Sequence, residues 1–254
     1  MSFQLDNPNY KNFFDKIKFN VDVPFNNSIK PPFENSSFFY IICGQPGSGK
    51  TSFLINLLKK HKNLANNIYF KVFDKILLVM PSNSRASIQN NIFNTLPSEQ
   101  IFDEVSIDLF ESIKVIKEMF DENKEEAKLK KKKYTTQHQL LILDDITAQL
   151  KDKDVEKMLV ELVLNRRHLN LSIILLVQVL NKIPKSVRSN CTSLIFFNTK
   201  AKAQLEIIRE EFILLDKKSF ENLIKFCFDK QHNFIFINKE GFFYKNLQKI
   251  NFPD

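Results

Sequence analysis

Short apolar runs alternate with amphipathic or polar stretches along this chain from Ser37 onward. The alternation is typical of a parallel sheet wrapped by helices, because strands buried on both faces read as continuous apolar runs. Each run is too short for a typical helix and is therefore interpreted as a buried strand. The predicted strands cover residues 38–43, 76–80, 140–143, 172–177 and 194–197. The pattern predicts an α/β fold with a mostly parallel central sheet flanked by helices.

Between these strands, apolar residues recur at the spacing of one helical face. Residues 51–60 place Phe53, Leu54, Leu57 and Leu58 on such a face. The other predicted helices cover residues 107–133, about 155–167, 200 to about 216, and 219–226. The chain closes with two apolar segments, residues 233–237 and 242–244, on either side of a Lys-Glu-Gly turn. This ending predicts a C-terminal β-hairpin.

The first 35 residues have a different composition, with Pro24, Pro31 and Pro32 standing among many asparagines. Because such a composition interrupts regular structure, residues 1–35 are predicted to form an N-terminal arm or irregular lead-in. Residues 36–254 are then one globular domain, and a hydrophobic content of 43% is enough for its core. Neither a signal peptide nor a membrane-spanning segment of roughly 20 apolar residues is visible, so we expect an intracellular protein.

Charge and cysteine content narrow the possible functions. A formal charge of +8 suits a polyanionic partner, and nucleic acid is the first candidate. Part of this charge is a run at Lys128 and residues 130–133, which is interpreted as a solvated helix end or, alternatively, as a DNA contact. Cys43, Cys191 and Cys227 lack CxxC or histidine-paired spacing, so they are expected to be small core residues rather than disulfide partners or zinc ligands.

A phosphate-binding loop follows the first predicted strand and precedes the first predicted helix. Its pattern, GxxxxGK[ST], turns backbone N–H groups toward phosphate oxygens, and the helix N-terminus adds positive potential. Three of the four glycines in the chain lie here. Lys50 is expected to reach the β- and γ-phosphates, and the Thr51 hydroxyl to ligate Mg²⁺. The predicted nucleotide-binding residues are Gly44, Gln45, Pro46, Gly47, Ser48, Gly49, Lys50, Thr51 and Ser52.

Two later strands end in polar residues suited to hydrolysis. The strand at residues 140–143 runs into Asp144 and Asp145, and Gln178 follows the strand at 172–177. Phosphoryl transfer to water needs a carboxylate associated with Mg²⁺ and a group that orients or deprotonates the attacking water. Asp144 and Asp145 can divide these roles. Gln178 stands at the edge where open α/β sheets place their ligands, and can contact the γ-phosphate or the attacking water.

Arg166 and Arg167 end the amphipathic helix that precedes the strand at residues 172–177. An arginine supplied across a subunit boundary can stabilise transition-state charge on the γ-phosphate. The alternative is a pair of exposed helix-end arginines that the helix dipole favours.

The ordered motifs GQPGSGKT, LLILDD, NRRHLNLSIILLVQ and KIPKSVRSNC resemble the poxvirus-type genome-packaging ATPases of large DNA viruses and virophages, in the FtsK/HerA superfamily. The resemblance covers about residues 36–250. It implies a RecA-like P-loop (ASCE) sheet with an added strand beside the P-loop strand. It also assigns Lys50 and Thr51 to the Walker A motif, Asp144 to Mg²⁺ binding, Gln178 to the sensor position and Arg167, with Arg166 as rival, to an arginine finger. Asp145 departs from the wider superfamily, whose cellular members tend to place Glu there.

The resemblance implies ATP hydrolysis with Mg²⁺, a homo-oligomeric ring, and translocation of double-stranded DNA into a capsid. The implied partners are double-stranded DNA, further copies of the chain in a hexamer or pentamer, and capsid or portal-vertex proteins. The implied location is host cytoplasm or viral factory, with virion association also open. A DNA pump or helicase-like ATPase acting outside packaging has the same active site. A P-loop nucleotide kinase and a nucleotide-binding scaffold without turnover are the alternatives from other classes.

Overall fold

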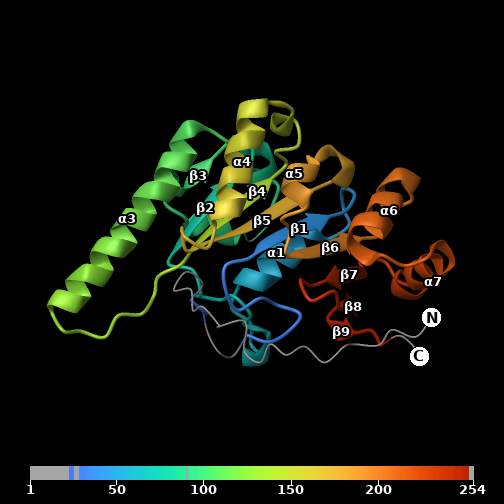
Figure 1. Cartoon of the computed structure of the whole chain (residues 1–254), viewed down its shortest axis with the longest axis horizontal. Helices are drawn as coiled ribbons and strands as arrows, with labels where there is room; N and C mark the ends of the chain where they lie inside the picture. Colours follow the sequence, from blue (N-terminus) through green and yellow to red (C-terminus); the bar gives the residue numbers. More distant parts are fainter. Residues whose placement is uncertain (1–22, 26–28, 90, 252–254) are drawn as a thin grey trace, which may run out of the picture.

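The structure, a computed structural model, describes residues 23–25, 29–89 and 91–251. One 9-stranded sheet, with strand order β3-β2-β4-β5-β1-β6-β7-β8-β9, runs through these residues (Figure 1). The strands are β1 (Phe39–Cys43), β2 (Lys75–Val79), β3 (Ile101–Phe102), β4 (Gln139–Asp144), β5 (Leu171–Val177), β6 (Ser193–Phe197), β7 (Phe234–Ile237), β8 (Phe243–Lys245) and β9 (Gln248–Lys249). The α-helices are α1 (Lys50–Leu58), α2 (Ser82–Ala86), α3 (Ile107–Leu129), α4 (Lys153–Asn165), α5 (Lys185–Arg188), α6 (Lys202–Ile208) and α7 (Lys217–Cys227). Shorter turns are η1 (Leu64–Asn66), η2 (Ile92–Thr95), η3 (Ser98–Gln100), η4 (Gln149–Lys151), η5 (Leu180–Lys182) and the π-helical η6 (Arg209–Ile213).

The strand order confirms the predicted mostly parallel α/β sheet. β1 pairs in parallel with β5 on one side and β6 on the other, and β5 separates β1 from β4. This intervening strand is the added strand expected of a RecA-like sheet. β7, β8 and β9 continue the sheet in antiparallel fashion, so the predicted C-terminal hairpin is confirmed and extends the main sheet beside β6.

Alternate residues of β1 point to opposite faces of the sheet, as the period of a strand requires. Phe39, Ile41 and Cys43 belong to the core that packs against α3, α4, α6 and α7. Tyr40 and Ile42 belong to the core on the other face, with α1. Burial on both faces is the reason that these strands read as continuous apolar runs in the sequence.

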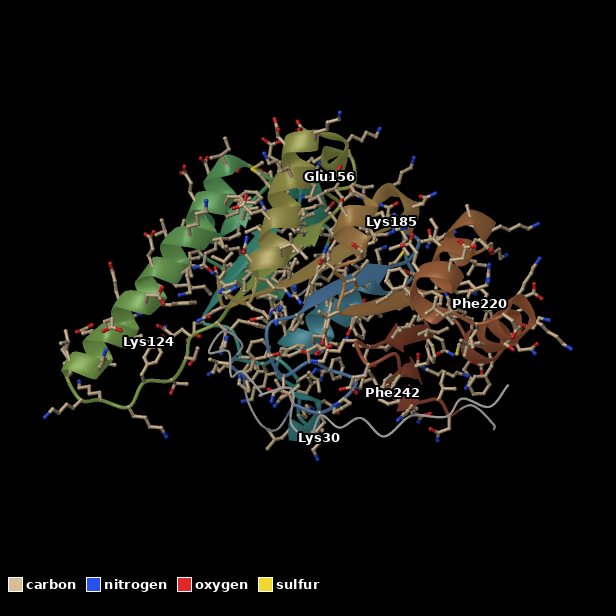
Figure 2. All side chains as sticks on the ribbon, in the orientation of Figure 1. Lys30, Lys124, Glu156, Lys185, Phe220 and Phe242 are labelled. Carbon is tan, nitrogen blue, oxygen red and sulfur yellow. The ribbon has the colours of Figure 1, made fainter. Side chains whose placement is uncertain are left out.

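Several elements differ from the sequence-based boundaries. The long helix ends at Leu129 rather than residue 133, and the lysines at 131–133 that follow it are exposed, as both a solvated helix end and a DNA contact require. Lys124 projects from the distal half of α3 (Figure 2). The helix predicted over residues 200–216 is split into α6 and the π-helical η6, and stops at Leu214, whose φ of 55° is left-handed. The edge strand β3 was not predicted, because two residues are too few to show an alternation.

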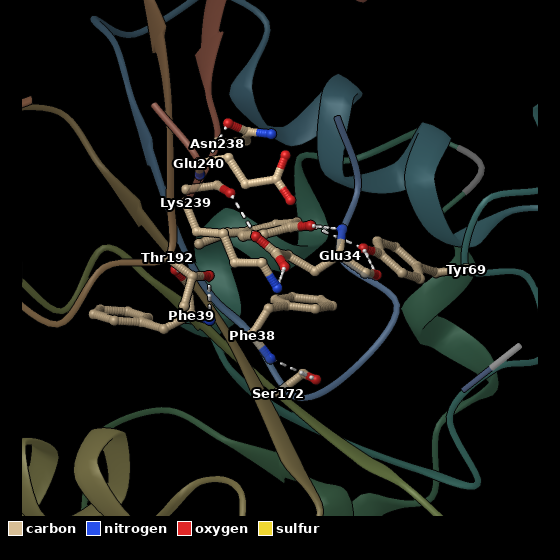
Figure 3. Close-up of polar contacts among 11 residues, drawn as sticks. Glu34, Phe38, Phe39, Tyr69, Ser172, Thr192, Asn238, Lys239 and Glu240 are labelled. Atoms are coloured by element: carbon tan, nitrogen blue, oxygen red, sulfur yellow. Dashed lines mark hydrogen bonds and ion pairs between the residues drawn. The ribbon is translucent and has the colours of Figure 1, made fainter. Parts of the chain in front are cut away.

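The described part of the lead-in is irregular and packed onto the domain. Glu34 donates its N–H to Tyr40 Oη at 2.8 Å, and Tyr69 Oη donates to the Glu34 carbonyl, also at 2.8 Å (Figure 3). The Glu34 carboxylate also pairs with Lys239 Nζ at 2.7 Å, which joins the lead-in to the C-terminal hairpin. Residues 1–22 and 26–28 of the predicted arm lie outside the described residues. In the part of the chain that the structure describes, no helix combines the length and the apolar character that crossing a membrane requires.

Candidate nucleotide-binding and catalytic site

The predicted phosphate-binding loop joins the carboxyl end of β1 to α1. Its first residue, Gly44, donates its N–H to the Val177 carbonyl of β5 at 3.1 Å. A Cβ atom at Gly44 would lie 2.5 Å from Ser48 Oγ and 2.8 Å from Phe197 Cβ, so the close packing of the loop excludes a side chain there. At the other end, Gly49 caps α1 with a φ of 112°, a left-handed value that glycine adopts without strain. The two glycines fix the loop against the sheet and aim it into the helix N-terminus.

Polar groups inside the loop suit a polyphosphate. Lys50 Nζ donates to the carbonyls of Gly44 at 2.6 Å and Gln45 at 3.2 Å. Burial lowers the pKa of Lys50, and the nearby Asp144 carboxylate opposes that shift. Among the described residues, Ser48 Oγ is buried without a hydrogen-bond partner, and a phosphate oxygen would satisfy it. The loop therefore offers an ammonium group, a hydroxyl and the N-terminus of α1 at one place.

Asp144 and Asp145 occupy the carboxyl end of β4. Burial raises the pKa of Asp144 to about 6, the Lys50 ammonium lowers it, and the Asp145 carboxylate raises it. A half-buried carboxylate in this setting is stabilised in its charged form by a cation. Asp145 is exposed and has a φ of 58°, a left-handed conformation that is uncommon outside glycine and clusters at functional sites.

A cavity of about 320 Å³ brings the predicted catalytic groups together. Asp144 pairs with Leu176 of the neighbouring strand β5, so Gln178, which follows Val177, lies at the same edge of the sheet. The cavity is lined by Pro46, Gly47, Lys50, Thr51, Ser84, Ser87, Ile88, Asp144, Asp145, Leu176, Val177 and Gln178. Loop, carboxylates and glutamine thus share one space.

Sequence reasoning missed Ser84 and Ser87, which belong to α2 and the turn after it. They follow the carboxyl end of β2, the neighbour of β4. A polar stretch after a buried strand is the signal that would have found them, because ligands of open α/β sheets bind at that edge.

The two candidate finger arginines lie at the amino end of β5, whereas the catalytic cavity lies at the carboxyl ends of the strands. Arg166 and Arg167 follow α4 and precede β5, whereas Gln178 follows β5. The seven residues of β5, at a rise of ~3.3 Å each, place the arginines about 20 Å from the catalytic cavity of their own subunit. Arg166 Nη1 donates to the Val163 carbonyl at 2.7 Å, while Arg167 is exposed. The structure therefore does not bring this pair together with the other predicted site residues.

Arg188, whose segment shares the family-like pattern, is held inside the subunit. Its guanidinium donates from Nε and Nη2 to Glu211 at 2.9 and 2.5 Å, and from Nη1 to the Ile183 carbonyl. These contacts tie the segment after Gln178 to the π-helical η6. Only 9% of the Arg188 side chain is exposed, so it does not project toward another subunit.

The site combines a strand, a glycine loop and a helix, and acidic and amide groups lie at the ends of the adjacent parallel strands. This combination defines a P-loop nucleotide hydrolase of RecA-like fold. The chain belongs to the family described as poxvirus A32 protein, which matches residues 30–252. This membership confirms the sequence-based resemblance and the prediction of a viral DNA-packaging ATPase.

Solved structures share the fold at low sequence identity. The DNA-packaging ATPase B204 from Sulfolobus Turreted Icosahedral Virus aligns with a TM-score of 0.53 and 19% identity, over 84% of this chain and 98% of that one. The genome packaging NTPase B204 from Sulfolobus turreted icosahedral virus 2, in complex with AMP, aligns with a TM-score of 0.51 and 14% identity over the same shares. EssC (ATPases 2 and 3) from Geobacillus thermodenitrificans aligns with a TM-score of 0.52 and 13% identity, over 85% of this chain and 41% of that one. A search of curated protein sequences found no match.

Proposed function

We propose that this protein hydrolyses ATP to drive double-stranded viral DNA into a capsid, as a ring of identical subunits. One observation carries the proposal: the P-loop, both carboxylates and Gln178 line a single cavity in a chain of the poxvirus A32 family. The two B204 structures, one named as a DNA-packaging ATPase and one in complex with AMP, support the same reading.

The residues of the cavity divide the work of hydrolysis. Lys50 exchanges the carbonyls of Gly44 and Gln45 for phosphate oxygens when ATP enters, because the ammonium is already aimed into the loop. Gln178 contacts the γ-phosphate or the attacking water. Asp145, exposed at the rim of the cavity, orients and deprotonates that water.

Thr51 and Asp144 fit Mg²⁺, since a hydroxyl and a carboxylate are hard oxygen ligands. Two protein ligands suffice, because Mg²⁺ commonly completes its shell with phosphate oxygens and water. When bound, the ion neutralises charge on the phosphate oxygens. The raised pKa of Asp144 fits this role, since a cation would favour its ionised form.

Arg167 is the proposed arginine finger and acts on the ATP of a neighbouring subunit. Its own catalytic cavity lies at the far end of β5, whereas its exposed side chain is free to cross a subunit boundary. Arg166 is the less suitable candidate, because its guanidinium bonds within its own subunit. A finger from a second copy requires a head-to-tail contact between subunits, and such contacts form a ring when their rotation closes.

The proposed partners are double-stranded DNA and the capsid or portal-vertex proteins that receive it, in the host cytoplasm or viral factory. The net charge of +8 suits a polyanion, and the exposed lysines after α3 are one place where DNA can contact the protein. Capsid association during assembly distinguishes packaging from DNA pumping elsewhere.

The test is ATP hydrolysis by the assembled protein with and without double-stranded DNA. We expect DNA to stimulate phosphate release, and assembled protein whose rate ignores DNA would count against translocation. Transfer of the γ-phosphate to a nucleotide instead of water would establish a kinase.

The variant Asp145→Asn separates binding from turnover. We expect it to retain ATP binding and to lose hydrolysis by about 10²–10⁴-fold, the usual contribution of a positioned base. Asp154→Asn, at an exposed carboxylate in the first turn of α4, is the matched control and should leave the rate unchanged. Full turnover by Asp145→Asn would remove this carboxylate from the mechanism.

A further inference from the structure

A second and larger cavity opens on the side of the P-loop away from the carboxylates. Its volume is about 720 Å³, within the range of roughly 300–1,000 Å³ that is common for small-molecule sites. Gly47, Gly49, Lys50 and Thr51 line it, so it shares a wall with the phosphate-binding loop. A ligand in this cavity can therefore be continuous with a phosphate chain in the loop.

The sheet order determines which end of a nucleotide this cavity can receive. The catalytic groups follow β4 and β5, on one side of β1. Phe197 ends β6 and Phe234 begins β7, on the other side of β1, and both line the large cavity. A nucleotide whose terminal phosphate reaches Asp144 and Gln178 can therefore place its opposite end beside β6 and β7, in the large cavity.

The walls of the cavity suit an aromatic base. The ring of Phe234 lies 4.9 Å from Phe53 and 5.5 Å from Phe197, measured between centroids, so the three rings form one apolar wall. His232 continues that wall, and its Nδ1 lies 3.1 Å from the Ser48 carbonyl of the P-loop. Exposed Asn56, on α1, supplies a polar group for a ribose or a base edge.

We propose that this aromatic cavity binds the adenine base and ribose of ATP, an inference that rests on the nucleotide site proposed above. The C-terminal hairpin thereby becomes part of the nucleotide site, through Phe234 and the loop that carries His232. A neighbouring cavity of about 360 Å³ is the competitor. It also touches the loop, but it is lined mainly by polar residues and does not reach the first turn of α1.

The experiment compares two ligands that differ only by the nucleoside. Binding of ATP and of inorganic triphosphate, both as Mg²⁺ complexes, is measured calorimetrically without DNA. Phe53→Ala removes part of the aromatic wall, and Asn56→Trp fills the cavity from an exposed position of α1. Gln231→Ala, which changes a residue of the smaller cavity alone, is the matched control.

Both cavity variants should weaken ATP binding about tenfold or more, because Phe53→Ala loses a ring contact with the base and Asn56→Trp occupies the space that the base would fill. Their affinity for inorganic triphosphate should stay within about twofold of wild type, which also shows that the P-loop is folded. Equal losses for both ligands, or unchanged ATP affinity, would overturn the proposal. A selective ATP defect in Gln231→Ala would place the nucleoside in the smaller cavity instead and also overturn it. The binding experiment measures no turnover and is therefore independent of DNA packaging. Wild-type protein that binds ATP but fails to package DNA would contradict the proposed function without contradicting this inference.

Discussion

Replacing Arg188 with alanine should destabilise the fold, because this arginine is a structural link. Its guanidinium makes two hydrogen bonds to the Glu211 carboxylate and one to the Ile183 carbonyl. Hydrogen bonds to charged groups contribute about 1.5–3 kcal/mol each to stability, and breaking a fully buried ion pair costs about 3–5 kcal/mol. The Glu211 side chain is 25% exposed and can regain water. The expected loss of folding stability is therefore at the lower end of this range, about 3 kcal/mol.

Thermal unfolding measures this loss. At about 2–4 °C per kcal/mol for a domain of this size, Arg188→Ala should lower the Tm by about 6–12 °C. Arg167→Ala, at an exposed position, is the matched control and should change stability by at most about 0.5 kcal/mol. An Arg188→Ala protein with an unchanged Tm and lost ATPase activity would refute the structural role and make Arg188 a catalytic candidate.

The pH dependence gives an independent check on the same pair. The hydrogen bonds from Arg188 hold the pKa of Glu211 below its ordinary value of 4.5. Because the folded-state pKa is the lower one, the pair stabilises the protein above about pH 4.5 and loses its effect as pH falls through the folded-state pKa. The Tm difference between wild type and Arg188→Ala should therefore shrink below pH 4.5. A difference that stays constant there would mean that the ion pair is not its source.

Three further outcomes follow from named contacts. Tyr69→Phe removes a hydroxyl that bridges Tyr40 and the Glu34 carbonyl, and should cost about 1–2 kcal/mol in urea unfolding; equal midpoints would contradict this. Burial raises the pKa of Cys43 and Cys191 to about 12, so both thiols should resist alkylation at pH 8 until the protein unfolds, and rapid labelling of native protein would contradict their packing. Arg167→Ala should retain ATP affinity and lose most hydrolysis in assembled protein, whereas full activity would exclude it as a finger.

The central strands could be predicted because burial on both faces leaves a direct trace in the sequence. Residues 140–143 and 173–177 are unbroken apolar runs, and both lie in strands of the parallel core. The end of the helix predicted over residues 200–216 could not be predicted, because the π-helical η6 keeps the apolar spacing of a helix. Its termination at Leu214 depends on a left-handed backbone that no residue pattern announces, since leucine rarely adopts it.

The catalytic cavity was predictable only where a side chain follows a strand that the motifs had already identified. Asp144 and Gln178 met that condition, and neighbouring parallel strands bring them to one edge. Ser84 did not, because its approach to the P-loop depends on β2 lying next to β4, a strand order that local patterns do not encode. His232 could not be predicted either, because its contact with the Ser48 carbonyl spans 184 residues of sequence and also depends on the strand order.

The arginine pair shows how geometry sharpens a hypothesis that the sequence left open. The sequence pattern cannot distinguish two adjacent arginines at a helix end. In the structure, however, the Arg166 guanidinium donates to the Val163 carbonyl, whereas Arg167 is exposed. Both lie about 20 Å from their own catalytic cavity, the length of β5 at ~3.3 Å per residue. A guanidinium on a flexible side chain cannot bridge that distance within one subunit. If an arginine finger completes the site, the finger must therefore come from a second copy, and hydrolysis must rise with protein concentration until the assembly is saturated.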